Sequence, residues 1–280
     1  DTGDDTINSA SGSDTFVYRS GDGSDVIFEY AWSTSETDRL QLLDLNPVDI
    51  QLRRGGGGLD DLFVLDQTTG QEIEVDDHFF STTDNYGIEE IEFADGTVWN
   101  RSDILENAWI RGGSGDDTLS VTDDTDDTFF GGLGNDTITS DDGDDTFVYR
   151  SGDGSDLIYE NAWSTSETDT LHLLDLNAVD VELRRGGGGL DDLYVKDIVT
   201  GQEVEIEDHF FSVTDYYGIE ALRFADGSVW NRSDLLQNAW IRGGTGNDTL
   251  SVTDGSDDTF FGGLGDDSIT SDGGNDRFIY

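Results

Sequence analysis

The sequence predicts an all-β protein in which parallel β-roll (β-helix) segments alternate with β-rich domains that each carry one short helix. Three observations support this fold class. The 280 residues contain a recurring nine-residue pattern of glycine and aspartate, stretches in which apolar and polar residues alternate, and a long internal repeat. Alternation with a period of two is typical of half-buried strands, and a recurring short motif is typical of stacked coils.

The internal repeat has a period of 131 residues. DTFVYRSGDGSD begins at Asp14 and again at Asp145, and LRRGGGGLDDL begins at Leu52 and again at Leu183. Of the 149 positions that this shift aligns, 109 are identical. The same register occurs at both ends, and methionine is absent. We therefore expect an internal piece of a longer tandem array.

Each period divides into two parts. We expect β-roll segments at 1–30, 111–161 and 242–280, the last continuing beyond the chain, and β-rich intervening domains at 31–110 and 162–241. In the first intervening domain, alternation predicts strands at 49–53, 72–75 and 88–93, and Pro47 is expected to start a strand. Glycines predict turns at 55–58 and 94–96. A polar cap and an early acid predict a helix at 100–107.

The composition limits the possible partners. With 63 acidic and 14 basic residues the formal net charge is -49, which argues against binding nucleic acid or inserting into an anionic membrane. Such a chain repels itself unless cations neutralise it. Its 30 aromatic residues, the sum of 15 Phe, 9 Tyr and 6 Trp, are too many for a solvated tail. Cysteine is absent, which excludes disulfides and thiolate metal sites.

The nine-residue beat reads G-G-x-G-x-D-x-U-x, where U is large and apolar. Four stretches match in full: Gly112–Ser120, Gly131–Thr139, Gly243–Ser251 and Gly262–Thr270. Others, such as Ser140–Val148 and Gly154–Ile158, keep the second half. The glycines permit a tight turn, the aspartate supplies a carboxylate, and the apolar residue enters the core. Two beats make one coil of 18 residues, and coils stack about 4.8 Å apart.

Stacked coils would align like carboxylates in columns that a cation must neutralise. An all-oxygen donor set favours Ca²⁺ over Zn²⁺, which prefers His or Cys, and over Mg²⁺, which demands stricter geometry. We expect several Ca²⁺ per repeat. Asp126 and Asp127 lie in an irregular beat and are left out. The predicted metal-binding residues are Asp5, Asp14, Asp25, Gly112, Gly115, Asp117, Gly131, Gly134, Asp136, Gly143, Asp145, Gly154, Asp156, Gly243, Gly246, Asp248, Gly262, Gly265, Asp267, Gly274 and Asp276.

The beats resemble the haemolysin-type (RTX, repeats-in-toxin) calcium-binding nonapeptide repeat family. The intervening segments resemble the associated haemolysin-type calcium-binding-related domain, through DRLQLLDL at Asp38 and YGIEEIEFADGTVW at Tyr86. The resemblance implies a bacterial protein that is exported unfolded by type I secretion and folds on meeting external calcium. Its expected location is secreted, extracellular or at the cell surface.

The sequence signals for other functional residues are weaker. His78 and His209 occupy matching DHFF stretches, where a hydrogen-bonded structural histidine is favoured over a catalytic base. No nucleophile elbow and no H-E-x-x-H site is present. The six tryptophans are candidates for sugar stacking, but packing is favoured. We expect Arg53, Arg54, Arg184 and Arg185 to be solvated or to contact neighbouring repeats.

Three functions remain open. The favoured one is a non-enzymatic array of repeats, with no catalytic residues, that calcium folds and stiffens into an extracellular rod such as a filament, adhesin stalk or surface layer. The first alternative is the C-terminal secretion and folding module of a secreted RTX-type enzyme. The second is a glycan-binding module. The expected partners are calcium ions, neighbouring repeats of the same chain or like subunits, and surface glycans.

Overall fold

The computed structural model describes residues 2–30, 35–80, 86–121, 125–161, 166–211, 217–253 and 255–280. The chain divides into two compact units, Asp1–Arg111 and Gly112–Tyr280. The described residues form strands β1 to β26, two α-helices and two 3-10 helices, which confirms the predicted all-β class. No described helix has the length and apolar character needed to cross a membrane.

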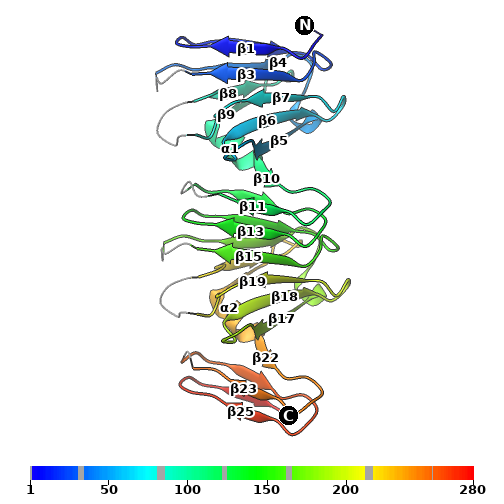
Figure 1. Cartoon of the computed structure of the whole chain (residues 1–280), viewed down its shortest axis with the longest axis vertical. Coiled ribbons are helices and arrows are strands. Elements are labelled where there is room, and N and C mark those ends of the chain that lie inside the picture. Colours follow the sequence, from blue (N-terminus) through cyan, green and yellow to red (C-terminus); the bar gives the residue numbers. More distant parts are fainter. Residues whose placement is uncertain are drawn as a thin grey trace. The chain divides into compact units, whose positions relative to one another are not determined.

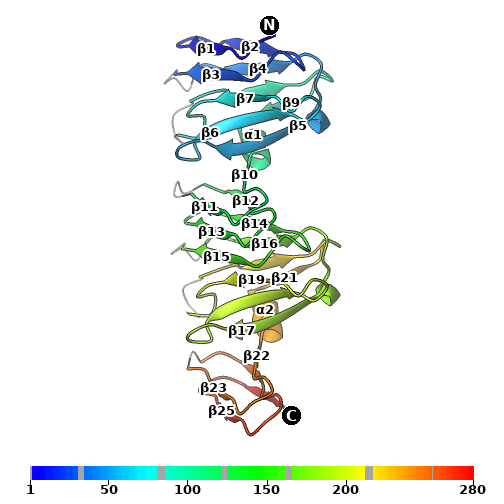
Figure 2. The same cartoon turned by 45° about the vertical axis from the view of Figure 1, so that its right-hand side comes forward.

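Parallel β-rolls make up the Gly/Asp-rich segments. In the second unit, β11 (Thr118–Ser120), β13 (Thr137–Ser140) and β15 (Asp156–Glu160) form one parallel face of the roll, stacked in sequence order (Figure 1). The other face consists of β12 (Thr128–Phe130), β14 (Thr146–Tyr149) and β16 (Thr170–Leu173). Each coil therefore contributes one strand to each face, as the 18-residue spacing predicts (Figure 2).

The apolar eighth position of each beat fills the space between the two faces. Leu119 pairs with Ile138, and Ile138 pairs with Ile158, so these side chains stack along one face. On the other face the rings of Phe129 and Phe147 stack at a centroid distance of 5.6 Å. All five side chains are buried. Burying these side chains provides the main apolar stabilisation of a roll that contains many glycines.

The remaining roll strands follow the same plan. In the first unit, β1 (Thr6–Ser9) pairs in parallel with β3 (Asp25–Glu29), and β2 (Thr15–Tyr18) with β4 (Arg39–Leu42). Near the C-terminus, β23 (Thr249–Ser251) pairs with β25 (Ser268–Thr270), and β24 (Thr259–Phe261) with β26 (Arg277–Ile279).

The first intervening segment continues the sheets of the roll. An antiparallel meander of β5 (Ile50–Gly55), β6 (Asp61–Asp66) and β7 (Glu72–Val75) joins the roll because β7 pairs in parallel with β3. A hairpin of β8 (Glu90–Glu92) and β9 (Val98–Asn100) adds to β4. Helix α1 (Arg101–Asn107) follows, and β10 (Trp109–Arg111) returns alongside β5.

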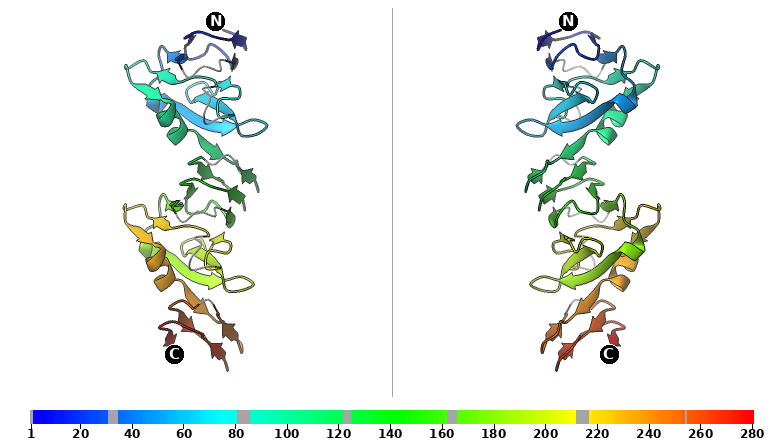
Figure 3. Two further views of the ribbon diagram at one scale, coloured as in Figure 1. Left: turned by 90° about the vertical axis from the view of Figure 1, so that its left-hand side faces the viewer. Right: turned by 90° about the vertical axis from the view of Figure 1, so that its right-hand side faces the viewer.

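The second intervening segment has the same elements in the same order. They are β17 (Val181–Gly186), β18 (Asp192–Asp197), β19 (Glu203–Ile206), β20 (Ala221–Arg223), β21 (Val229–Asn231), α2 (Arg232–Asn238) and β22 (Trp240–Arg242). Within the second unit, helix α2 lies against β17, and the turn that joins β17 to β18 points away from the helix (Figure 3). Strand β22 pairs with both β17 and β24, so one sheet runs from this segment into the following roll.

The structure confirms several local predictions and corrects one. Asn100 caps helix α1 by accepting hydrogen bonds from the N–H groups of Ser102 and Asp103, and the glycine turn at 55–58 joins β5 to β6. Pro47, which was expected to start a strand, instead begins the 3-10 helix Pro47–Asp49, and the strand starts at Ile50. Its fixed φ suits the first position of a helical turn, where its missing N–H costs nothing.

Candidate calcium-binding columns

The turns of the roll are formed by glycines that allow neighbouring coils to touch. Gly134 has a φ of +135°, and a Cβ on it would lie 2.2 Å from the carbonyl oxygen of Gly115 in the preceding coil. Gly131 is crowded by a side chain instead, because a Cβ there would lie 2.2 Å from Oδ2 of Asp136. The glycine pattern therefore permits close stacking and leaves the space that the aspartate occupies.

The sixth-position aspartates form what we call the inner columns. In one column, the backbone N–H of Asp117 donates to Oδ1 of Asp136 at 2.8 Å, and the N–H of Asp136 donates to Oδ1 of Asp156 at 3.0 Å. In the facing column, the N–H of Asp127 donates to Asp145, and that of Asp145 to Asp169, both at 2.8 Å. Predicted aspartates thus lie one above another in successive coils.

The same bond recurs in the other rolls. The N–H of the first residue donates to Oδ1 of the second in the pairs Asp5 and Asp25, Asp14 and Asp38, Asp248 and Asp267, and Asp258 and Asp276. The inner columns therefore combine a regular hydrogen-bond ladder with a line of negative charge.

The fifth positions form outer columns, which sequence reasoning missed. Here the side chain of one coil accepts a bond from the backbone N–H of the next coil. Asp116 accepts from Asn135, Asn135 accepts from Ser155, and Ser155 accepts from Glu203, at 2.8, 3.0 and 3.2 Å. The outer columns thus work equally with an acid, an amide or a hydroxyl, whereas the inner position in every beat is aspartate.

This contrast indicates what the inner columns need. An asparagine side chain offers the same acceptor oxygen as aspartate, so the hydrogen bond alone does not require a carboxylate. A buried line of carboxylates without cations is unfavourable because each charge is desolvated and repels the next. The exclusive use of aspartate therefore points to a bound cation.

The raised pKa values of three inner-column aspartates agree with a bound cation. Burial, opposed in part by the hydrogen bond from the preceding N–H, raises the pKa of Asp145 and of Asp156 to about 7. For Asp169, burial and the nearby acids Glu160, Glu220 and Asp145 raise the pKa to about 9. Without a cation, these groups hold protons near neutral pH.

Asp136 provides the test of fit for calcium. Its side chain is buried, Oδ1 is engaged by Asp117, and Oδ2 is buried with no hydrogen-bond partner among the described residues. A buried carboxylate oxygen without a partner is costly, and a cation would satisfy it. Carboxylate and backbone carbonyl oxygens are the ligands that Ca²⁺ prefers, so the residues present fit this ion.

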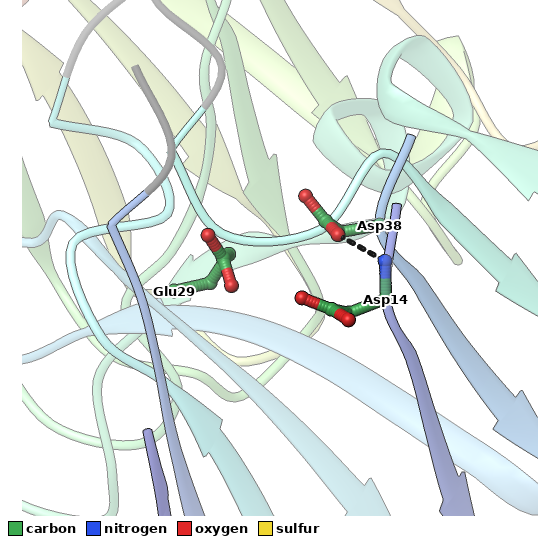
Figure 4. Close-up of side chains that lie close together, drawn as sticks. All are labelled: Asp14, Glu29 and Asp38. Atoms are coloured by element: carbon green, nitrogen blue, oxygen red, sulfur yellow. Dashed lines mark hydrogen bonds between the residues drawn. The ribbon is translucent and has the colours of Figure 1, made fainter. Parts of the chain in front are cut away.

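The structure also joins one predicted residue, Asp14, to acids that the sequence did not single out. Asp14, Glu29 and Asp38 have carboxylate oxygens within 4.8 Å of one another, where the roll meets the intervening segment (Figure 4). Glu29 and Asp38 are buried. Asp127, which was left out of the predicted ligands, lies buried in the inner column, one coil before Asp145. Asp38 escaped notice because its column partner is 24 residues away, not 18.

Two features were not expected from a model in which all ligands come from the beats. The carbonyl of Gly154, a predicted ligand, accepts a hydrogen bond of 3.0 Å from the Tyr149 hydroxyl. Further acidic clusters lie in the intervening segments, outside the beats: Asp60, Asp61 and Asp77; Asp61, Glu74 and Asp76; and Asp191, Asp192 and Asp208. The remaining predicted glycine ligands lie in the turns of the rolls, and their part in metal binding stays a prediction.

The histidines and tryptophans outside the rolls are packed into the fold. His78 and His209 are fully buried, and Nδ1 of His78 accepts a 3.3 Å bond from Ile88. Burial lowers the pKa of both histidines, which keeps them neutral. These observations favour a structural role.

The tryptophan rings have protein neighbours as well. The guanidinium of Arg242 lies 4.5 Å from the ring centre of Trp240, and Trp230 packs edge-on against Phe224. Trp32 and Trp163 lie outside the described residues. The contacts of the described tryptophans favour packing over sugar stacking.

Comparison with known proteins identifies the family. The model for the RTX calcium-binding nonapeptide repeat matches residues 1–27, 107–122, 121–158, 237–258 and 252–279. The model for the haemolysin-type calcium binding protein related domain matches 61–103 and 192–234. Together they match most of the chain, which belongs to the family of haemolysin-type RTX calcium-binding repeat proteins. It is a calcium-binding repeat protein of the secreted type.

Among solved structures, the extracellular lipase LipA from Serratia marcescens is similar over 73% of this chain and 36% of the lipase chain, at 18% identity and a TM-score of 0.23. The chain thus spans about a third of the length of that lipase. No curated protein matched the chain.

Proposed function

We propose that this chain is part of a non-enzymatic structural array in which Ca²⁺ folds and stiffens the rolls of an extracellular rod. The rod would be a filament, an adhesin stalk or a surface layer of the secreting bacterium. The observation that carries the proposal is that every residue placed in the inner columns carries a carboxylate, aspartate in each beat, beside outer columns that tolerate asparagine and serine. Calcium at the inner columns would join successive coils at the position where repulsion is greatest.

Stiffening follows from where the ions would bind. A cation shared by carboxylates of adjacent coils couples those coils, and the ladder of hydrogen bonds fixes their spacing. Because the second intervening segment shares a sheet with the roll on each side, stiffness in one part passes to the next through paired strands. Extracellular modules commonly bind Ca²⁺ at roughly 10⁻⁴–10⁻³ M, so the array would stay unfolded inside the cell and fold outside it.

The proposal is tested by titrating the chelated 280-residue chain with Ca²⁺ while recording far-UV circular dichroism, with Mg²⁺ as the control ion. We expect β signal to appear cooperatively with Ca²⁺ and to be lost when chelator is added. Small-angle scattering of the same samples should show a smaller radius of gyration, and the cross-section of a compact rod should appear, once Ca²⁺ is bound. A spectrum that is the same with chelator and with Ca²⁺ would exclude calcium-driven folding.

A further inference from the structure

A buried ion pair lies at the start of the last inner column. Nη1 of Arg185 is 2.6 Å from Oδ1 of Asp258, and each side chain is only 1% exposed. The same Nη1 donates to Oγ of Ser256 at 3.3 Å, and Ser256 donates to Asp258 at 3.1 Å. Arg185 belongs to β17 of the intervening segment, whereas Asp258 directly precedes β24 of the following roll. Arg185 was expected to be solvated or to contact a neighbouring repeat. Instead it is buried against Asp258 within the second unit.

Asp258 is the first inner aspartate of its column. Its N–H donates to Oδ1 of Asp276 in the following coil, as Asp127 does to Asp145 in the earlier roll. Arg185 thus places a positive charge against the end of a carboxylate column, on the side away from Asp276. A guanidinium keeps its charge at any physiological pH and offers donors in a fixed plane.

The protein holds this guanidinium in place with other contacts. Nε of Arg185 donates to the carbonyl of Leu190 at 2.8 Å, and the guanidinium lies 4.4 Å from the ring centre of Phe210. The adjacent Arg184 differs, because it pairs with Glu203 where both side chains are about a third exposed. Two neighbouring arginines on one strand therefore have a buried and a surface role.

A second guanidinium lies at the end of the preceding column. The N–H of Asp169 donates to Oε2 of Glu220 at 2.9 Å, which extends the inner column by one acid. Oε1 of Glu220 is 3.3 Å from Nη1 of Arg232. Arg232 also donates to the carbonyls of Tyr217 and His209, so it is fixed by its own segment. The first intervening segment repeats this arrangement with Arg101, which lies 3.9 Å from Glu89.

We propose that the intervening segments cap the carboxylate columns with their own guanidinium groups, which replace calcium at the column ends. Arg185 caps the start of the column of Asp258 and Asp276, and Arg232 caps the end of the column of Asp145 and Asp169. Each roll then has an end that is neutral before any ion binds, and calcium-driven folding starts from that end. This proposal rests on the proposed function, because the caps matter only if the columns bind calcium.

The test uses hydrogen exchange of the full 280-residue chain during a Ca²⁺ titration, read in peptides from 249–279. Arg185→Gln should raise the Ca²⁺ concentration for half-maximal protection tenfold or more, because it removes the positive charge beside the buried Asp258 carboxylate. Arg184→Gln, the neighbouring surface arginine, should change it less than about twofold. Adding Asp258→Asn to Arg185→Gln should restore most of the loss, since the end of the column is then neutral.

The outcomes separate the two proposals. If Ca²⁺ does not change protection of 249–279 in the unaltered chain, both proposals fail. If Ca²⁺ protects the unaltered chain but Arg185→Gln behaves like Arg184→Gln, the capping role is wrong and calcium-driven folding stands. If the double variant remains as impaired as Arg185→Gln, Arg185 acts by packing on Phe210 and the capping role is again wrong. The same conclusion holds if neither variant folds at any Ca²⁺ concentration.

Discussion

The backbone N–H of Asp136 donates a hydrogen bond of 3.0 Å to Oδ1 of Asp156 in the next coil, while Oδ1 of Asp136 accepts one from Asp117 in the previous coil. One residue thereby ties three successive coils together. Its second carboxylate oxygen is buried without a partner among the described residues. The hydrogen bonds fix where this oxygen lies, and a cation would complete its coordination.

Removing charge from an inner column should weaken calcium binding, while the same change in an outer column should not. Asp145→Asn keeps the oxygen that accepts from Asp127 but removes the charge, so the calcium midpoint of folding should rise about tenfold or more. Asp144→Asn is the control, because an amide can still accept from Thr168. Calcium titrations followed by circular dichroism make the comparison. Equal effects of the two changes would show that charge at the inner column is unimportant.

Filling the space beside an inner carboxylate should disrupt its turn. Gly131→Ala places a methyl group 2.2 Å from Oδ2 of Asp136, so the carboxylate must move and folding with calcium should weaken by about 1–3 kcal/mol. Gly115→Ala is the control, since nothing lies within 4 Å of its added methyl group. Urea unfolding in saturating Ca²⁺ measures both. Equal stability of the two variants would mean that Asp136 does not occupy this position.

The pH dependence of stability between about pH 5 and 9 should be present without calcium and largely lost when calcium is bound. Burial raises the pKa of Asp145 and of Asp156 from 3.8 to about 7, and that of Asp169 to about 9. In chelator, the folded roll therefore binds more protons than the unfolded chain. The stabilisation from these protons is complete below about pH 4 and is lost as pH rises through about 7 to 9.

Calcium displaces these protons, so with saturating Ca²⁺ neither the folded roll nor the unfolded chain binds them between about pH 5 and 9, and stability should depend little on pH there. Because the chelated chain is expected to be unfolded near neutral pH, the folded fraction is measured by far-UV circular dichroism at pH 5 and pH 8, with Ca²⁺ and with a chelator that remains effective at pH 5. Stability that increases with pH in both conditions would contradict protonation of the inner columns.

The contribution of helix capping to the free energy of unfolding should be independent of calcium. Asn231 accepts hydrogen bonds from the N–H groups of Ser233 and Asp234 at the start of α2, so Asn231→Ala should cost about 1 kcal/mol. The loss should be the same at two Ca²⁺ concentrations that both keep the chain folded, because the cap lies in the intervening segment. Urea unfolding at those concentrations is the measurement. Asn231→Asp, which retains a capping oxygen, should restore most of the stability, and a failure to do so would count against the cap.

Periodic features of the fold could be predicted from sequence because each depends on neighbours along the chain. The positions of Leu119 and Ile138 within their beats predicted a shared core, and both are buried. The cap at Asn100 predicted the start of α1. Pro47 was misassigned because a fixed φ suits both an extended strand start and the first turn of a 3-10 helix.

The parts of the site that could not be predicted depend on contacts between distant residues. Asp169 and Glu220 share a column although 51 residues separate them, because the intervening segment interrupts the 18-residue spacing. Arg185 and Asp258 are 73 residues apart. The outer columns were missed for another reason: a position that accepts aspartate, asparagine or serine looks variable, although all three can accept the same bond.

The most direct measurement is a crystal structure of this chain grown in Ca²⁺, with anomalous data collected at a wavelength where calcium scatters anomalously. We expect an anomalous peak about 2.3–2.6 Å from Oδ2 of Asp136, with further peaks beside the carboxylates of the inner columns. We expect no peak between Arg185 and Asp258. Folded rolls with no anomalous peak near Asp136, and with Oδ2 bonded to another protein group instead, would contradict the account.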